Sequence, residues 1–218
     1  MKYLFVIFFA LLCIQCHSQE KFDKCRENDE KSSRCIFEYQ MTENAIYLDS
    51  ALFYINEVLG TCQIDYKLAL RKVIIYTEKQ DFEKAINFTD SLDSNLFFLP
   101  YYKSLISNRV KAMKAQYEGD TIARNKFINT IVLEVGDYME QNKNEIDSFM
   151  KLPDIEEVLK SPYSIVPVQY YYYKSLIEGV EKTKLQVDSL QQAIRGNEEY
   201  FEMIKVAIDE DFMYFVGF

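Results

Sequence analysis

Residues 65–92, DYKLALRKVIIYTEKQDFEKAINFTDSL, decide the fold class of this chain. Side chains that suit a buried face recur here every three or four residues, on both sides of a short turn at Gln80–Asp81. That spacing is the period of an α-helix with one buried face. Asp65 and Asp81 precede the two runs, where a carboxylate caps the first backbone N–H groups of a helix. The stretch therefore predicts two amphipathic helices joined by a tight turn. Their buried faces comprise Leu70, Val73, Ile74 and Thr77, and then Phe82, Ala85, Ile86, Thr89 and Leu92.

The same pattern continues on both sides of this pair, from Thr42 to the end of the chain. With 6 Gly and 4 Pro in 218 residues, the composition suits long helices joined by short turns. We expect an all-α protein of stacked antiparallel helical hairpins, built either as a repeat solenoid or as an irregular helical bundle. We place a single α-helical domain over 41–218 and a long helix over 167–194. Breaks in the pattern fall at Gly60, Gly119–Asp120, SPYSIVP (161–167) and Gly196.

The helix pair in 65–92 resembles the repeating unit of the tetratricopeptide repeat family. The residues that carry the resemblance are Tyr76, Asp81-Phe82-Glu83-Lys84-Ala85-Ile86 and, as a poorer second match, Ala115, Gly119-Asp120 and Ala123. They look like the family's helix-A tyrosine, interhelix turn and helix-B alanine. Ala69, Lys72 and Val73 depart from its large-residue and Leu-Gly positions. The resemblance covers 65–140 and implies a scaffold that binds proteins or peptides, without catalytic residues.

A second feature is the recurrence of YYKSLI at 101–106 and at 172–177, the second time behind two further tyrosines. The equivalent positions 102 and 173 are 71 residues apart, close to two units of a helical-hairpin repeat. We interpret the recurrence as duplicated architecture.

The run of four tyrosines at 170–173 goes right round a helix. Heptad spacing over 167–194 predicts Tyr173 in the core, with Tyr170 and Tyr172 at its flanks. Tyr171 points the opposite way, and we expect it to face solvent or to lie under a neighbouring helix. Tyr171 is therefore the candidate residue for contact with a partner.

The N-terminal stretch MKYLFVIFFALLCIQCHSQ combines Lys2 with a short apolar run over 3–14. A positive start before a run too short to span a bilayer is typical of a secretory signal. We expect 1–18 to be a signal peptide and the protein to be exported. Cleavage after Ser18 predicts a soluble periplasmic protein. The stretch also resembles a bacterial lipoprotein leader, which implies a lipid on Cys16 and attachment to the outer membrane.

Three cysteines follow the leader, and export permits disulfides. Segment 19–40 is polar and charged with little helical pattern, so we expect an arm stapled by a disulfide. Cys25 pairs with Cys35 inside the arm, or Cys35 pairs with Cys62, and the odd number of thiols leaves the choice open.

The charge and residue inventory argues against most catalysis. The net charge of −9 repels phosphate backbones, which excludes a nucleic-acid partner and favours a basic one. The sole histidine, His17, lies in the leader, so Ser-His-Asp chemistry and histidine-ligated metal sites are not expected. No phosphate-binding glycine motif is present. We expect no catalytic residues, cofactor or metal.

These features predict a non-enzymatic envelope protein that binds a protein or peptide, such as an assembly factor or the neutralising partner of a toxin. The alternative is a small enzyme or glycan-binding protein that uses paired carboxylates and tyrosines. Membrane contact is expected only through the lipid anchor.

Overall fold

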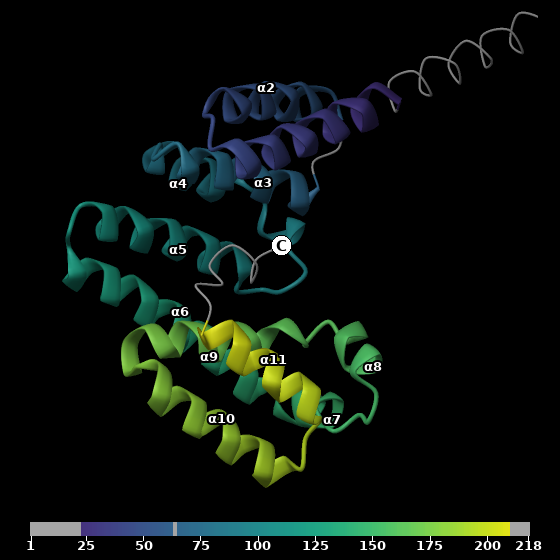
Figure 1. Cartoon of the computed structure of the whole chain (residues 1–218), viewed down its shortest axis with the longest axis vertical. Coiled ribbons are helices and arrows are strands. Elements are labelled where there is room, and N and C mark those ends of the chain that lie inside the picture. Colours follow the sequence, from purple (N-terminus) through teal and green to yellow (C-terminus); the bar gives the residue numbers. More distant parts are fainter. Residues whose placement is uncertain (1–22, 63–64, 210–218) are drawn as a thin grey trace, which may run out of the picture. The chain divides into compact units, whose positions relative to one another are not determined.

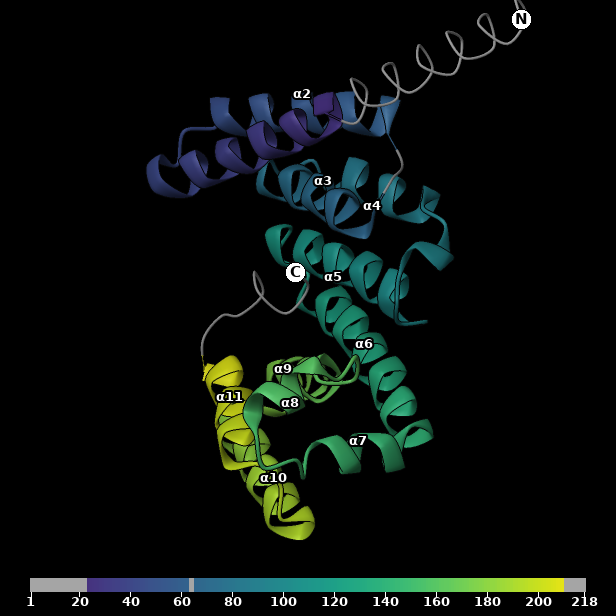
Figure 2. The same ribbon diagram turned by 90° about the vertical axis from the view of Figure 1, so that its right-hand side faces the viewer.

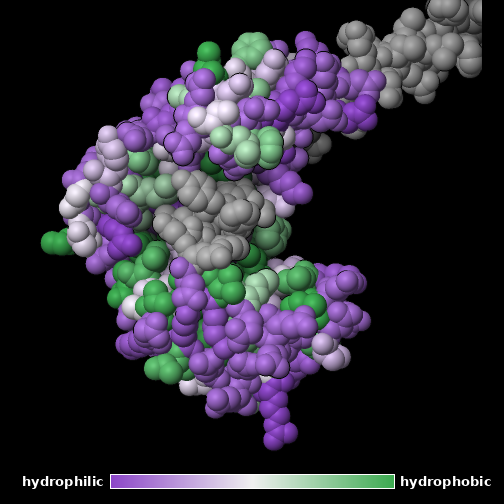
Figure 3. All heavy atoms as spheres, in the orientation of Figure 1, coloured by the Kyte–Doolittle hydropathy of each residue, from purple (hydrophilic) through white to green (hydrophobic). Residues whose placement is uncertain are grey.

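A computed structural model describes residues 23–62 and 65–209 of the chain (Figure 1). All regular structure in these residues is helical, so the predicted all-α class is confirmed. On the face shown in Figure 3, most of the surface is hydrophilic, and smaller hydrophobic areas lie among the hydrophilic residues. A helix over 23–42 is followed by α2 (Ile46–Thr61), α3 (Tyr66–Glu78), α4 (Phe82–Ser91), the short 3-10 helix η1 (Ser94–Leu96), α5 (Tyr102–Tyr117), α6 (Thr121–Gln141), α7 (Lys143–Phe149), α8 (Ile155–Lys160), α9 (Ile165–Glu178), α10 (Val180–Ile194) and α11 (Glu198–Asp209).

The chain divides into two compact units rather than one domain over 41–218. Unit 1 ends at Ala85 and unit 2 begins at Ile86, so the boundary lies within α4. Each unit has its own buried residues, and each is described separately below.

Unit 1 contains a helix where the sequence analysis expected an arm. The described part of that segment is helical and runs beside α2 (Figures 1 and 2). Its buried positions include Asn28 and Ser32, which are polar, so the hydrophobic pattern gave little signal. Arg71 on α3 donates to Asp29 Oδ1 at 2.5 Å and so links this helix to α3. The unit's core comprises Leu48, Ala51, Ile55, Val58, Leu68 and Ile75, with Cys35, Ile36, Tyr39, Leu52, Leu59 and Cys62 packed against it.

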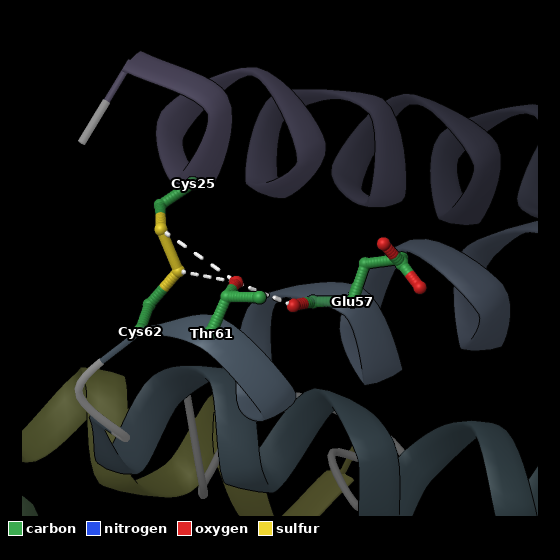
Figure 4. The surroundings of a disulfide bond; sticks show 4 residues. All are labelled: Cys25, Glu57, Thr61 and Cys62. Carbon is green, nitrogen blue, oxygen red and sulfur yellow. Dashed lines mark hydrogen bonds between the residues drawn. A yellow bond between two sulfur atoms is a disulfide. The ribbon is translucent and has the colours of Figure 1, made fainter. Parts of the chain in front are cut away.

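The disulfide joins Cys25 to Cys62, which is neither of the two expected pairings (Figure 4). Their Cα atoms lie 6.3 Å apart. Cys25 and Cys35 share one helix and are ten residues apart, which is about 15 Å along its axis and too far for a bridge. Cys35 carries a free thiol. The Thr61 hydroxyl lies 3.2 Å from the Cys62 sulfur and donates to the Glu57 carbonyl.

The turns after α3 and α5 have the same hydrogen-bonding pattern. Gln80 and Gly119 both have positive φ, 59° and 76°. The next residue donates its N–H back to Tyr76 in the first turn and to Ala115 in the second, each at 2.8 Å. This is the Schellman arrangement, which satisfies the last carbonyl groups of a helix. The predicted hairpin turns at 80–81 and 119–120 are therefore confirmed.

Unit 2 is built around α9, which contacts α6, α10 and α11. The last helix, α11, returns onto both α9 and α10, so unit 2 is an irregular bundle and not a simple stack of neighbours. Asn197 caps α11 by accepting from the Tyr200 N–H, and its side chain also donates to the carbonyls of Leu152 and Pro153.

The expected single helix over 167–194 is wrong, because Gly179 separates α9 from α10. Gly179 has φ 93° and ψ 149°, a conformation that side chains with a Cβ rarely adopt. The heptad pattern that continues from Tyr173 to Ile194 is therefore divided between two helices that pack on each other.

The two YYKSLI segments are not structurally equivalent. The first opens α5, and its Lys103 ammonium donates to the carbonyls of Asp90 in the last turn of α4 and of Leu92 just after that helix. The second lies in the C-terminal half of α9, where Lys174 donates to the Tyr170 hydroxyl instead. The shared letters therefore do not mark equivalent positions of two repeats.

Candidate functional site

A pocket of about 400 Å³ in unit 2 is the candidate site. Residues of α6, α7, α9 and α10 line it, and Figure 2 shows these helices around one region of the unit. Two of the four consecutive tyrosines, Tyr170 and Tyr171, form part of its wall. Half of the tyrosine run therefore belongs to the pocket.

The inner part of the pocket is apolar. Ile146 and Met150, which line it from the α7 side, are 2% and 1% exposed. Leu190 and Ile194 of α10 line another side and are half-buried. A methionine side chain adapts its shape readily, so this surface can fit apolar groups of different outline.

Tyr170 is held in position by its neighbours. The Lys174 ammonium donates to the Tyr170 hydroxyl at 3.2 Å and lies 5.1 Å from the centre of its ring. Lys174 also pairs with Glu178 at 3.7 Å. Hydrogen bonding from Lys182, supported by Gln186 and by the charge of Lys174, holds the pKa of the Glu178 carboxyl below its usual value.

Gly136 on α6 provides the space for the Tyr170 ring. A Cβ at this position would lie 3.0 Å from Tyr170 Cε2, closer than an ordinary contact. The glycine thus permits α6 to approach the aromatic wall of the pocket.

Tyr171 is buried, with 7% of its surface exposed, so of the two placements expected from the sequence it has the covered one. It does not offer an exposed ring to a partner. The Tyr171 hydroxyl forms no hydrogen bond within the described residues. Two side-chain oxygens there are fully enclosed and have no hydrogen-bond partner, Glu134 Oε2 and Gln186 Oε1, and the Tyr171 oxygen is not one of them. The hydroxyl oxygen therefore has accessible surface, and Tyr171 is one of the residues that line the pocket. Burial, with a contribution from Tyr170, raises the pKa of Tyr171 to about 12, which keeps the phenol protonated as a donor.

The rim of the pocket is acidic. Glu140 and Asp147 line it together with Lys143, which pairs with Glu140 at 3.7 Å. Both partners of this pair are more than half exposed, so solvent screens their attraction. Residues 137–147 carry four carboxylates and one ammonium, so their net charge is 1 − 4 = −3.

The other residues singled out by sequence lie away from this pocket. Cys16 and the expected signal peptide at 1–18 fall outside the described residues. Cys25 and Cys62 are joined in unit 1, and burial raises the pKa of the Cys35 thiol.

The described residues contain no group of three or more His, Cys, Asp or Glu side chains that could hold a metal ion. No helix in the described part of the chain has both the length and the apolar character needed to cross a membrane.

Sequence reasoning missed Glu140, Asp147 and the apolar residues behind them. Glu140 and Asp147 are seven residues apart, but α6 ends before Asn142 and α7 begins after it, so no single helical face predicts their meeting. The only available signal was the acidic character of 137–147.

No protein-family model, curated protein or solved structure matches the chain. The tetratricopeptide resemblance therefore stays an interpretation of residue pattern, alongside the shared turn geometry at Gln80 and Gly119.

Proposed function

We propose that this chain is an exported, non-enzymatic protein of the bacterial envelope that binds another protein or peptide through unit 2. The observation that carries the proposal is the pocket, which combines an apolar interior, a protonated phenol donor and an acidic rim on a helical scaffold. A partner segment with apolar and basic residues has the matching chemistry. Roles as an assembly factor or as the neutralising partner of a toxin both require such binding.

The proposed location rests on the leader sequence and agrees with a disulfide in unit 1. The protein is then either soluble in the periplasm or attached to the outer membrane by a lipid on Cys16. Mass spectrometry of the mature N-terminus separates the two: an acylated Cys16 shows the anchored form, and a free Gln19 shows the soluble one.

A glycan-binding protein or carboxylate-based enzyme is the second candidate, because Glu140 and Asp147 border the same tyrosine-lined pocket. Glycosidases place two carboxyl groups across the scissile bond of a sugar. This candidate predicts binding of neutral oligosaccharides in the pocket, which the first does not.

The test is cross-linking in the native envelope followed by mass spectrometry, with the pocket filled in one variant. Ala193 lines the pocket and is exposed, so Ala193→Trp should fill it without disturbing the core. Gln192→Trp adds the same side chain to the neighbouring exposed position of α10, outside the pocket lining, and serves as the control.

We expect a defined protein partner with the wild type and with Gln192→Trp, and at least a tenfold loss with Ala193→Trp. A partner captured equally by all three would place binding elsewhere on the molecule. Absence of any protein partner, with oligosaccharide bound instead, would overturn the proposal.

A further inference from the structure

We propose that the pocket recognises an apolar side chain next to a lysine or arginine, presented on a peptide segment whose main-chain carbonyl accepts from Tyr171. This inference rests on the proposed function and specifies the chemistry of the partner at that site. Three features of the pocket carry it.

The first is size and lining. About 400 Å³ is room for one large side chain and the backbone beside it, near the lower end of the roughly 300–1,000 Å³ of small-ligand sites. Leu190 and Ile194 line the pocket and are half-buried, so they supply the apolar surface that an inserted group contacts, with Ile146 and Met150 packed behind. A leucine- or phenylalanine-sized side chain therefore gains most from this space.

The second is the Tyr171 hydroxyl. More than nine-tenths of Tyr171 is buried, the residue lines the pocket, and its hydroxyl has no partner among the described residues. Because the phenol is protonated well above neutral pH, it can donate to an acceptor on the ligand. A peptide carbonyl is such an acceptor, and it accompanies every side chain that could enter.

The third is charge. Glu140 and Asp147 stand at the rim, and Asp147 forms no ion pair within the described residues. The nearby cations are already engaged, Lys143 with Glu140 and Lys174 with Glu178 and Tyr170. A cation beside the inserted apolar group therefore meets carboxylate, whereas an anion there is repelled.

The probe is the peptide acetyl-Gly-Leu-Lys-Gly-amide, titrated into the isotope-labelled mature chain at low ionic strength. Binding is followed by NMR through the amide of Gly136, which lines the pocket. Two matched peptides replace Lys by Glu or Leu by Ser, and lactose tests a neutral glycan. We expect saturable shifts with the first peptide and at least tenfold weaker binding of both replacements and of lactose.

Three variants assign the contacts. Tyr171→Phe should weaken binding about fivefold, the loss of one hydrogen bond. The double variant E140Q/D147N should weaken it about threefold to tenfold, and the difference should shrink in high salt. Lys143→Gln should tighten binding slightly, because it removes a competing cation. E156Q/E157Q changes the same charge on α8, away from the pocket, and should leave binding unchanged.

Equal binding of the Lys and Glu peptides, or binding that Tyr171→Phe leaves intact, would overturn the inference. Preferential binding of lactose would also overturn it, in favour of a glycan site. If all probes fail while the cross-linked partner is still lost with Ala193→Trp, the inference fails and the proposed function stands. If the peptides do not bind and no cross-linked partner depends on the pocket, both the inference and the proposed function fail.

Discussion

The hydroxyl environment distinguishes the tyrosines of unit 2 from one another more sharply than burial does. Tyr171, Tyr172 and Tyr173 are 7%, 1% and 3% exposed, so all three rings are in the core. The buried Tyr101 hydroxyl donates to Gln169 Oε1 at 2.8 Å, whereas the Tyr171 hydroxyl has no partner among the described residues. The Tyr171 hydroxyl is therefore available to donate a hydrogen bond to a ligand.

Truncation of the tyrosine ring should therefore be costly at both 171 and 173. We expect Tyr171→Ala and Tyr173→Ala each to lower the free energy of unfolding by about 3–5 kcal/mol, measured by urea denaturation. The heptad pattern had placed Tyr173, but not Tyr171, in the core. A cost below about 1 kcal/mol at Tyr171 would contradict its buried position.

Removal of the hydroxyl alone separates binding from stability. Tyr171→Phe should change the free energy of unfolding by less than about 0.5 kcal/mol, because no hydrogen bond is lost. Tyr101→Phe is the matched control and should cost about 1–3 kcal/mol, because the buried Gln169 oxygen loses its donor. Equal costs for the two variants would mean that the Tyr171 hydroxyl has a partner in the protein.

At the scale of elements, one glycine turn and one disulfide decide how the helices are arranged within their units. Gly179 turns an apparently continuous helix into α9 and α10, and the turn lets both contact α11. In unit 1 the bond between Cys25 and Cys62 joins the first described helix to the end of α2. That helix has a partly polar inner face, so the covalent link compensates for limited apolar burial.

Loss of the disulfide should destabilise unit 1 selectively. It closes a loop with a sequence separation of 37, for which the chain-entropy model predicts about 3–4 kcal/mol. We expect the double variant C25S/C62S to lower the stability of unit 1 by about 2–4 kcal/mol, measured by hydrogen exchange of α2 and α3. Cys35→Ala should leave exchange nearly unchanged, since its thiol is free. Equal protection in the double variant would show that packing alone holds the first helix.

At the scale of the whole molecule, the tyrosine-rich core of unit 2 predicts sensitivity to alkaline pH. Burial raises the pKa of Tyr101, Tyr171, Tyr173 and Tyr200 above the usual value near 10, to about 12 for Tyr171. The unfolded chain loses these protons first. Each tyrosine therefore contributes its full stability below pH 10, and the contribution falls as pH rises toward the folded-state pKa.

We expect the urea midpoint of unit 2 to change little from pH 7 to 9 and to fall steeply above pH 10. For Tyr171 the slope is about 1.4 kcal/mol per pH unit between pH 10 and 12. Tyr171→Phe should reduce the slope in that range by this amount. A variant with the wild-type slope would show that Tyr171 ionises normally in the folded protein.

Much of the fold was predictable because helices are local. The turns at 80–81 and 119–120 and the cap at Asp65 depend on neighbouring residues, and the structure confirms them. The helix over 23–42 was missed for a local reason. Asn28 and Ser32 are buried although polar, so the helix that contains them left little hydrophobic pattern.

The sequence by itself determined the all-α class, the hairpin turns and the acidic charge, because period, capping and composition act over a few residues. Only the tertiary structure decided the partner of Cys25, the division of α9 from α10 and the position of Tyr171. A disulfide and a pocket depend on which residues distant in the chain come together, and helical periodicity carries no information about that.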